Sequence, residues 1–293
     1  MKFMRLKWLY FLISALVIIP GIVSLAMFGL KPSIDFTGGT LLELRFQKKI
    51  EATQFEEIKS VIKGKGFDLG SIQSSGENSI LIRTKPITKD EASVIKSALA
   101  EKLEEMPEEE RFETVGPSLG RELLIKTIVA VFLAASFILL YVARQFKNAK
   151  FGICAILAMF HDSLVLLGVF SLLGHFFGVE VDTLYVTAVL TILSFSVHDT
   201  VVVYDRIRES QKYLSNVPFE SLVDKAVTET LSRSLNNSLT IIFMLIALWL
   251  MGGETIRWFV FALLIGTISG TYSSTFTAAP LLVVWENLVK KKR

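Results

Sequence analysis

Apolar residues gather into six long runs along this chain, and polar stretches separate the runs. The runs cover residues 8–28, 123–142, 151–173, 184–204, 235–251 and 259–285. A helix rises about 1.5 Å per residue, so runs of this length cross, or nearly cross, the roughly 30 Å hydrocarbon core of a bilayer. The pattern therefore predicts six transmembrane helices.

The composition supports a membrane protein and excludes several kinds of site. The 293 residues are 52% hydrophobic, and the mean hydropathy is +0.52, which is typical of a polytopic membrane protein with the lipid bilayer as its main surroundings. The net charge of +3 is small, and no nucleic-acid partner is expected. Cys154 is the single cysteine, so one chain can form neither an internal disulfide nor a cysteine-based metal or redox site.

Between residues 31 and 120 charges recur every few positions, which predicts a soluble domain. Alternation or short apolar runs predict strands at 40–46, 67–74, 79–84 and 111–115, and helical spacing predicts a helix at 53–63. Thr88 and Glu91 form a capping-box pattern that begins a second helix, ending near residue 106. The order strand, helix, strand, strand, helix, strand is typical of a ferredoxin-like α+β fold.

The positions of Lys and Arg predict the orientation of the chain. Basic residues lie before the first run, after the second, after the fourth and at the C-terminal end, and these four places share one side of a six-span chain. By the positive-inside rule both termini are cytoplasmic and the domain is extracytoplasmic. The expected division is 1–30 for the first helix, interpreted as a retained anchor; 31–120 for the domain; and 121–293 for helices two to six. A separate surface helix is expected from Pro218 to about residue 227.

The fourth run contains His198 and Asp199 between apolar residues. A carboxylate near the centre of a membrane helix costs roughly 2.5–3.5 kcal/mol on insertion scales, so it usually lines a polar path or has a partner. The functional interpretation is a proton or ion carrier at Asp199. The plainer alternative is a side chain that reaches back to the basic interface. Hydroxyl residues gather in the same run, which favours a face packed on protein or water: Thr187, Thr191, Ser194 and Ser196.

The third run contains His161, Asp162 and Ser163, a tripeptide similar to the one at positions 198–200. Two His and two Asp on adjacent helices could bind zinc. Polar helix contacts and neighbours in a proton relay explain the tripeptides better, so no metal and no other cofactor is expected. Small residues in the sixth run are explained by close helix packing alone: Gly266, Ser269, Gly270, Ser273, Ser274 and Thr277.

Arg233 lies just before the fifth run, beside Asn236 and Asn237. It could be a simple positive-inside anchor. Alternatively, it could turn inward as the counter-ion of Asp199, because a paired buried charge is less unfavourable than an isolated one.

Four stretches together resemble the SecF branch of the SecD/SecF family, which belongs to the RND superfamily. They are Ile-Asp-Phe-Thr-Gly-Gly-Thr at 34–40, Val-Gly-Pro-Ser-Leu-Gly at 115–120, the run at 196–209 around His198 and Asp199, and Thr-Leu-Ser-Arg-Ser-Leu at 230–235. The resemblance extends over essentially the whole chain.

The resemblance implies an all-α membrane domain of six transmembrane helices, equivalent to half of an RND unit, with a ferredoxin-like extracytoplasmic domain between helices one and two. It implies a non-enzymatic subunit in the bacterial cytoplasmic (inner) membrane that uses the proton-motive force to assist preprotein translocation. The implied partners are SecD, SecYEG, YajC and preprotein clients. The family's essential Asp and Arg correspond to Asp199 and Arg233, and the family usually has Asn where this chain has His198. With Asp162, these residues form the expected proton-coupling set.

Three other functions compete with this one. The chain could be the half-unit of an RND-type transporter for small molecules or lipids, or a structural scaffold for a translocon. It could also be an intramembrane aspartyl protease that uses Asp162 and Asp199. That enzyme class is disfavoured, because the Gly-x-Gly-Asp pattern it requires is replaced by Ser-Val-His-Asp at 196–199.

Overall fold

The computed structural model describes residues 2–50, 52–75, 78–146, 148–213 and 217–292. The chain divides into two compact units, one made of Met1–Lys31 with Val129–Arg293 and the other of Pro32–Ile128. Each unit has its own buried apolar core.

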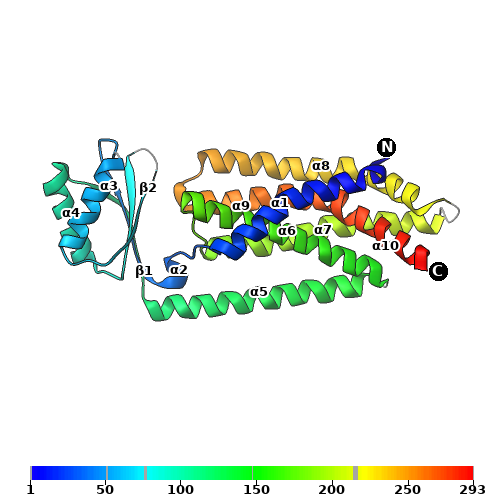
Figure 1. Ribbon diagram of the computed structural model, residues 1–293, viewed down its shortest axis with the longest axis horizontal. Coiled ribbons are helices and arrows are strands. Elements are labelled where there is room, and N and C mark those ends of the chain that lie inside the picture. Colours follow the sequence, from blue (N-terminus) through cyan, green and yellow to red (C-terminus); the bar gives the residue numbers. More distant parts are fainter. Residues whose placement is uncertain (1, 51, 76–77, 147, 214–216, 293) are drawn as a thin grey trace. The chain divides into compact units, whose positions relative to one another are not determined.

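Within the described part of the unit Pro32–Ile128, four strands form one antiparallel sheet in the order β2-β3-β1-β4 (Figure 1). The elements are α2 (Ile34–Thr37), β1 (Gly39–Arg45), α3 (Ala52–Gly64), β2 (Leu69–Ser75), β3 (Ser79–Thr84), α4 (Lys89–Leu103) and β4 (Glu108–Val115). The predicted strands and helices are therefore confirmed. The second helix is shorter than expected, because Glu104 adopts a left-handed conformation that ends α4.

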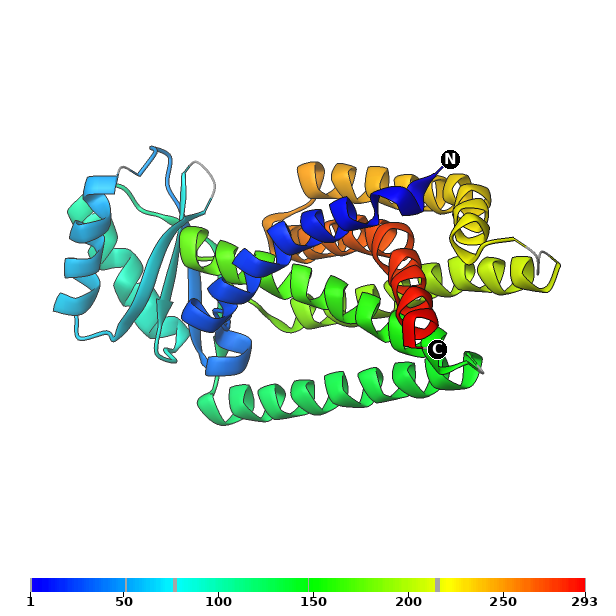
Figure 2. The same cartoon turned by 45° about the vertical axis from the view of Figure 1, so that its right-hand side comes forward.

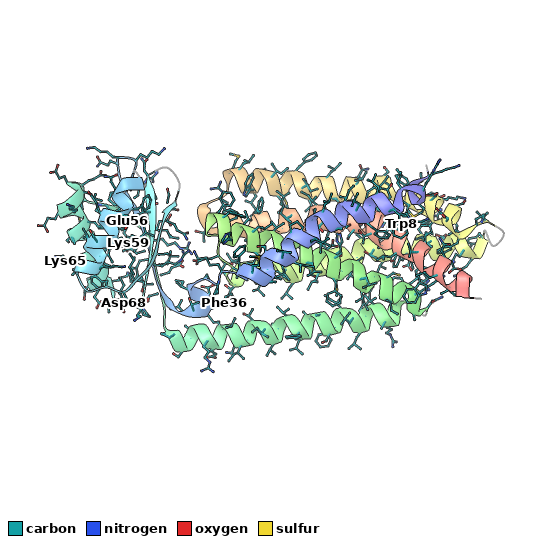
Figure 3. All side chains as sticks on the ribbon, in the orientation of Figure 1. Trp8, Phe36, Glu56, Lys59, Lys65 and Asp68 are labelled. Atoms are coloured by element: carbon teal, nitrogen blue, oxygen red, sulfur yellow. The ribbon has the colours of Figure 1, made fainter. Side chains whose placement is uncertain are left out.

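Local sequence explains how this sheet is covered. The Glu91 amide donates to Thr88 Oγ1 at 3.3 Å and the Thr88 amide donates to Glu91 Oε2 at 2.7 Å, which confirms the capping box at the start of α4. Residues on one face of β1 and β3, such as Leu42 and Ile82, are buried with Ile58 of α3 and Ile95 of α4. Figure 3 labels Glu56 and Lys59 on α3, where they form an ion pair at 3.2 Å.

Two of the stretches that carry the family resemblance pack on one another. Gly38 and Gly39 have positive φ angles of 73° and 130°, which favour glycine. A Cβ on Gly38 would lie 2.8 Å from Cα of Pro117, and a Cβ on Gly120 would lie 2.8 Å from the amide nitrogen of Gly38. The turn before β1 therefore lies directly against the start of α5, and a side chain at Gly38 or Gly120 would force them apart.

Among the described residues, six helical segments are long and apolar enough to cross a membrane, so the chain is a multi-pass membrane protein. The elements are η1 (Phe3–Leu6), α1 (Lys7–Phe28), α5 (Pro117–Gln145), α6 (Ala149–Phe177), α7 (Thr183–Tyr213), α8 (Phe219–Met251), α9 (Glu254–Ser273), η2 (Ser274–Ala278) and α10 (Ala279–Lys292). Trp8, labelled in Figure 3, lies exposed near the start of α1, an arrangement typical of aromatic residues at a membrane interface.

Two expectations for the helices are corrected. The predicted surface helix and the fifth span are one continuous helix, α8, because no proline or glycine interrupts the sequence between residues 219 and 251. The sixth span is not one regular helix. A π-helical turn, η2, separates α9 from α10. Such turns insert one extra residue and so change which side chains face the core.

Helices α1 and α6 cross at very close range (Figure 2). A Cβ on Gly168 would lie 2.6 Å from Cα of Gly21, so neither position accepts a side chain without a shift. One turn further along, the hydroxyls of Ser24 and Ser171 lie 2.8 Å apart. Small residues that let two backbones approach are the usual basis of tight helix packing in membranes.

Candidate functional site

Asp199 lies on α7 and is buried, with 6% of its surface exposed. Its Oδ1 accepts a hydrogen bond of 3.0 Å from Ser234 on α8, and its Oδ2 accepts one of 2.7 Å from Ser274, the first residue of η2. No other hydrogen bond to this carboxylate is found among the described residues. Asp199 thus joins three helical segments through two serine hydroxyls. A free lone pair remains on each oxygen.

Asp162 lies on α6 and is more deeply buried, at 1% exposed. Its Oδ1 interacts with Ser269 Oγ at 2.6 Å and His161 Nδ1 at 3.0 Å, and its Oδ2 accepts from Ser196 and Ser273 at 2.5 and 2.6 Å. An ionised carboxylate offers about four acceptor positions, and these four groups can fill them all. The ring nitrogen is therefore assigned as a donor to this carboxylate.

The two carboxylates are linked through adjacent serines at the junction of α9 and η2. Ser273 contacts Asp162 and Ser274 contacts Asp199. Each hydroxyl also lies near a backbone carbonyl one turn back, Gly270 O at 3.2 Å for Ser273 and Thr271 O at 3.1 Å for Ser274. A serine with two acceptors can turn its proton from one to the other, which lets it accept a hydrogen bond from a carboxyl that gains a proton.

His161 extends this polar cluster toward α1. Its Nε2 lies 3.0 Å from Ser14 Oγ, and Ser14 lies 3.4 Å from Thr277 Oγ1 on η2. The ring of Tyr272 stacks against the imidazole with the ring centres 6.2 Å apart. The cluster is almost entirely buried.

Arg233 does not contact Asp199 in this structure. The side chain lies exposed on α8, and no ion pair of the described residues joins it to the carboxylate. Its neighbour Ser234 is the residue that α8 presents to Asp199. Asn236 and Asn237 are exposed as well. Arg233 is therefore next in sequence to a residue of the buried site, but its charge lies on a surface open to lipid or to a partner.

His198 also lies outside the cluster, although it is next to Asp199 in sequence. Successive residues of an α-helix point about 100° apart. His198 is exposed and lines a groove of about 380 Å³ between α5 and α7, together with Phe137, Ile138, Tyr141, Ser194, Val197 and Val201. The structure thus brings together Asp199 and Asp162 through serines, and it leaves His198 and Arg233 on other faces.

The serines of the sixth span contact the site, which their positions in the sequence did not lead us to predict. Ser269, Ser273 and Ser274 were explained by packing, yet each donates to a buried carboxylate. The signal was present, since two buried acids require donors and this run has the hydroxyls. Of the hydroxyls noted on α7, Ser196 reaches Asp162, whereas Thr187 and Thr191 donate to carbonyls of their own helix.

Comparison with known proteins finds similarity over nearly the whole chain. Residues 94–288 match the family described as "Protein export membrane protein SecD/SecF, C-terminal", and residues 23–50 match the "SecD/SecF GG Motif". The chain is 44% identical to the "Protein translocase subunit SecF" of Thermobaculum terrenum, over 97% of this chain and 93% of that protein. It is 35% identical to the "Protein translocase subunit SecDF" of Thermus thermophilus, over 88% of this chain and 35% of that protein.

A solved structure shares the fold. The crystal structure of SecDF from Thermus, described as a translocon-associated membrane protein, superposes with a TM-score of 0.86 at 33% identity. The match covers 98% of this chain but 39% of that one, so this chain spans about two fifths of the SecDF chain. With the family matches and the identity to SecF proteins over nearly their full length, these findings establish that the chain belongs to the SecD/SecF family of protein export membrane proteins, in its SecF branch.

Proposed function

We propose that this chain is an auxiliary subunit of the Sec export machinery that uses the proton-motive force, together with SecD, to assist preprotein translocation. The observation that carries the proposal is the buried Asp199 carboxylate, which two serines hold among the described residues, in the helix bundle of a SecF-family protein. The names of the relatives, translocase subunits, support a non-enzymatic transport role.

Asp199 is the proton carrier in this proposal. Two donors hold the ionised form, and Oδ2 can take a proton when the Ser274 hydroxyl turns its own proton away from this oxygen. When Asp199 is protonated, its O–H donates to Ser274, and the Ser274 proton turns to Thr271 O, 3.1 Å away. The packing of α7, α8 and η2 around Asp199 thus changes when a single proton binds. We propose that the proton gradient shifts the equilibrium between these two packing arrangements.

The energy available is sufficient for such a bias. Moving one charge through 100 mV is worth about 2.3 kcal/mol. A factor of ten in an equilibrium needs about 1.4 kcal/mol, so one proton can shift a two-state population more than tenfold.

Arg233, His198 and Asp162 complete the proposed proton-coupling set in different ways. Arg233 is the counter-ion of Asp199 in the state where α8 has turned, and in the state described here it faces outward. His198 adjusts the local charge from the α5–α7 groove. Asp162 stays ionised and holds the neighbouring helices in place through its donors.

SecD is the proposed direct partner, because relatives exist in which SecD and SecF form one chain. Further proposed partners are SecYEG, YajC and the preprotein clients. The proposed domain boundaries are those expected from the sequence. Residues 1–30 form the first helix, residues 31–120 form an extracytoplasmic ferredoxin-like domain, and residues 121–293 form the other helices. The βαββαβ order and the antiparallel sheet β2-β3-β1-β4 support the ferredoxin-like assignment.

The orientation in the bacterial cytoplasmic membrane is tested by labelling with a membrane-impermeant thiol reagent. Cys154 is buried and is first replaced by Ala. In that background, a cysteine placed at Lys85 in intact cells should react from outside, and one placed at Arg144 should react after the membrane is opened. The reverse pattern contradicts the proposed orientation.

The competing protease function is not supported, since an aspartyl dyad needs two carboxylates that share one proton. Here each carboxylate has its own serines, and among the described residues no hydrogen bond joins Asp162 to Asp199.

Proton flux separates the proposal from a pure scaffold. Vesicles that contain the chain with SecD, loaded with a pH indicator, should take up protons in response to an imposed gradient, and Asp199→Asn should abolish this flux. Ser232→Ala, an exposed change on α8, is the control and should leave the flux unchanged. A flux that survives in Asp199→Asn supports the scaffold.

A further inference from the structure

The cluster of Ser14, His161 and Asp162 has a geometry that the role of Asp199 does not explain. His161 lies between two polar partners, with Nδ1 3.0 Å from Asp162 Oδ1 and Nε2 3.0 Å from Ser14 Oγ. The imidazole is 8% exposed and the carboxylate 1%. Both ring nitrogens are therefore used, and they connect α6 to α1.

We propose that Ser14, His161 and Asp162 form a second proton-binding site in the helix bundle, in which the imidazole takes the proton and Asp162 remains a carboxylate. An imidazole is a stronger base than a carboxylate, with ordinary pKa values of about 6.5 and 3.9. The Asp162 carboxylate interacts in addition with three serine hydroxyls that stabilise its charge. A proton that enters the pair therefore goes to the ring.

The hydrogen bonds remain complete in both protonation states. In the neutral state, the ring donates from Nδ1 to Asp162 and accepts from the Ser14 hydroxyl at Nε2. When a proton binds at Nε2, that nitrogen becomes a donor to Ser14 Oγ, and the Ser14 proton turns to Thr277 Oγ1, 3.4 Å away. No bond other than N–H forms, and the imidazolium charge is balanced by the carboxylate beside it.

The other groups around the ring do not compete for this proton. On α9, Tyr272 stacks on the imidazole, and its hydroxyl donates to the backbone oxygen of Tyr10 at 2.8 Å and also forms a side-chain hydrogen bond with Ser14. On α1 and η2 the facing groups are the neutral hydroxyls of Ser14 and Thr277, and on α7 the nearest is Ser196, which contacts Asp162. Asp162 is thus the charged group that faces His161 among the described residues.

Proton binding at this site would change how α1 packs, independently of Asp199. Ser14 reverses its donor and acceptor roles toward α6 and η2 when the ring is charged, so the packing of α1 on both segments depends on the proton. In sequence, α1 leads directly into the unit Pro32–Ile128. A role of this response in export rests on the proposed function, whereas proton binding at His161 is independent of it.

The proton on His161 can be measured directly, because the chain has three histidines. His175→Gln and His198→Asn leave His161 as the single ring, and ¹⁵N-labelled histidine in the full chain in lipid vesicles reports each ring nitrogen by solid-state NMR between pH 5 and 9. We expect the imidazolium to be populated within this range. In the same background, Asp162→Asn should lower the ratio of charged to neutral ring about tenfold or more at a given pH.

A matched control uses His198, which is exposed in the α5–α7 groove. A chain with His161→Asn and His175→Gln retains that ring alone, and Asp162→Asn should leave its titration unchanged. The proposal is overturned if the His161 ring stays neutral from pH 5 to 9. It is also overturned if Asp162→Asn does not change the charged fraction of that ring.

Ser14→Ala keeps the test decisive if Asp162→Asn prevents folding. It should move the Nε2 resonance of His161 and leave the Nδ1 resonance in place, and no change at either nitrogen contradicts the site. The two proposals fail separately. If Asp199→Asn keeps its proton flux while His161 still titrates with Asp162, the coupling role of Asp199 is wrong and the second site stands.

Discussion

The two buried carboxylates of the helix bundle differ in how completely they are hydrogen-bonded. Asp162 interacts with four donors, and Asp199 accepts from two. A fully occupied carboxylate is held in one charge state, because a proton would have to displace a donor. One with free lone pairs can gain or lose a proton with small adjustments. Burial alone therefore does not distinguish the two carboxylates, whereas the number of donors does, and on this difference we base the proposal that Asp199 carries the proton.

The largest expected effect on stability comes from removing the Asp162 carboxylate. Asp162→Ala leaves three serine hydroxyls and the His161 ring without their acceptor, and should lower the free energy of unfolding by about 2–4 kcal/mol. Asp199→Ala frees two hydroxyls, of which that of Ser274 also lies 3.1 Å from Thr271 O, and should cost about 1 kcal/mol. Reversible unfolding in mixed micelles measures both. Equal losses for the two variants would remove the basis of the comparison.

Arg233→Lys tests the exposed charge next to the Asp199 site. Lysine keeps the charge but lacks the planar fork that binds a carboxylate through two hydrogen bonds. The force-dependent part of export should fall about tenfold, as expected for a loss of about 1.4 kcal/mol in the coupled state. Stability should change by less than about 0.5 kcal/mol, because the side chain is exposed. Lys225→Arg, an exposed cation on the same helix, is the matched control and should export normally.

The adjacent serines allow a sharper contrast, since they are one residue apart and serve different carboxylates. Ser274→Ala removes one of two donors to Asp199 and should reduce force-dependent export several-fold. Ser273→Ala removes one of four from Asp162 and should leave export near normal. Each should cost about 0.6 kcal/mol of stability, the average for a hydrogen bond between membrane helices. Equal effects on export would mean that the two carboxylates share one role.

The smallest effect is expected at His198. Its ring lies in the α5–α7 groove and not in either serine cluster, so His198→Asn should keep export largely intact. The substitution removes the imidazole and leaves both buried carboxylates with their serines, so the rate of export should change by less than about threefold at any pH. A defect as complete as that of Asp199→Asn would place His198 in the proton path itself.

The sequence allowed the elements to be predicted where the pattern was strong. The strands β1 and β3, the Thr88 and Glu91 cap and the six apolar runs all appear as expected, although β1 is buried along nearly its whole length and does not alternate. The break at η2 was not predicted, because no proline or glycine in Ser274–Ala278 marks it in the sequence. The continuity of α8 was missed because the polar residues before 235 were interpreted as the end of a separate surface helix, although no proline or glycine there breaks a helix.

For the candidate site, sequence identified the acids but not their partners. Asp162 and Asp199 stand out as charges in apolar runs, and the structure places both in the core. Which hydroxyl serves which acid depends on helix rotation and crossing, and one-dimensional spacing does not determine these. The predicted pair of Asp199 with Arg233 stays a prediction for another state of the protein, since Ser234 fills that place here.

The central claim is that a proton on Asp199 couples the gradient to export, and preprotein translocation into membrane vesicles tests it most directly. Vesicles with matched amounts of the unaltered chain, Asp199→Asn or the control Ser232→Ala, each with SecD, are compared with and without a proton-motive force. The account predicts that the unaltered chain and the control respond to the force, and that Asp199→Asn inserts, folds and exports at the force-independent rate. A full response in Asp199→Asn would contradict the account.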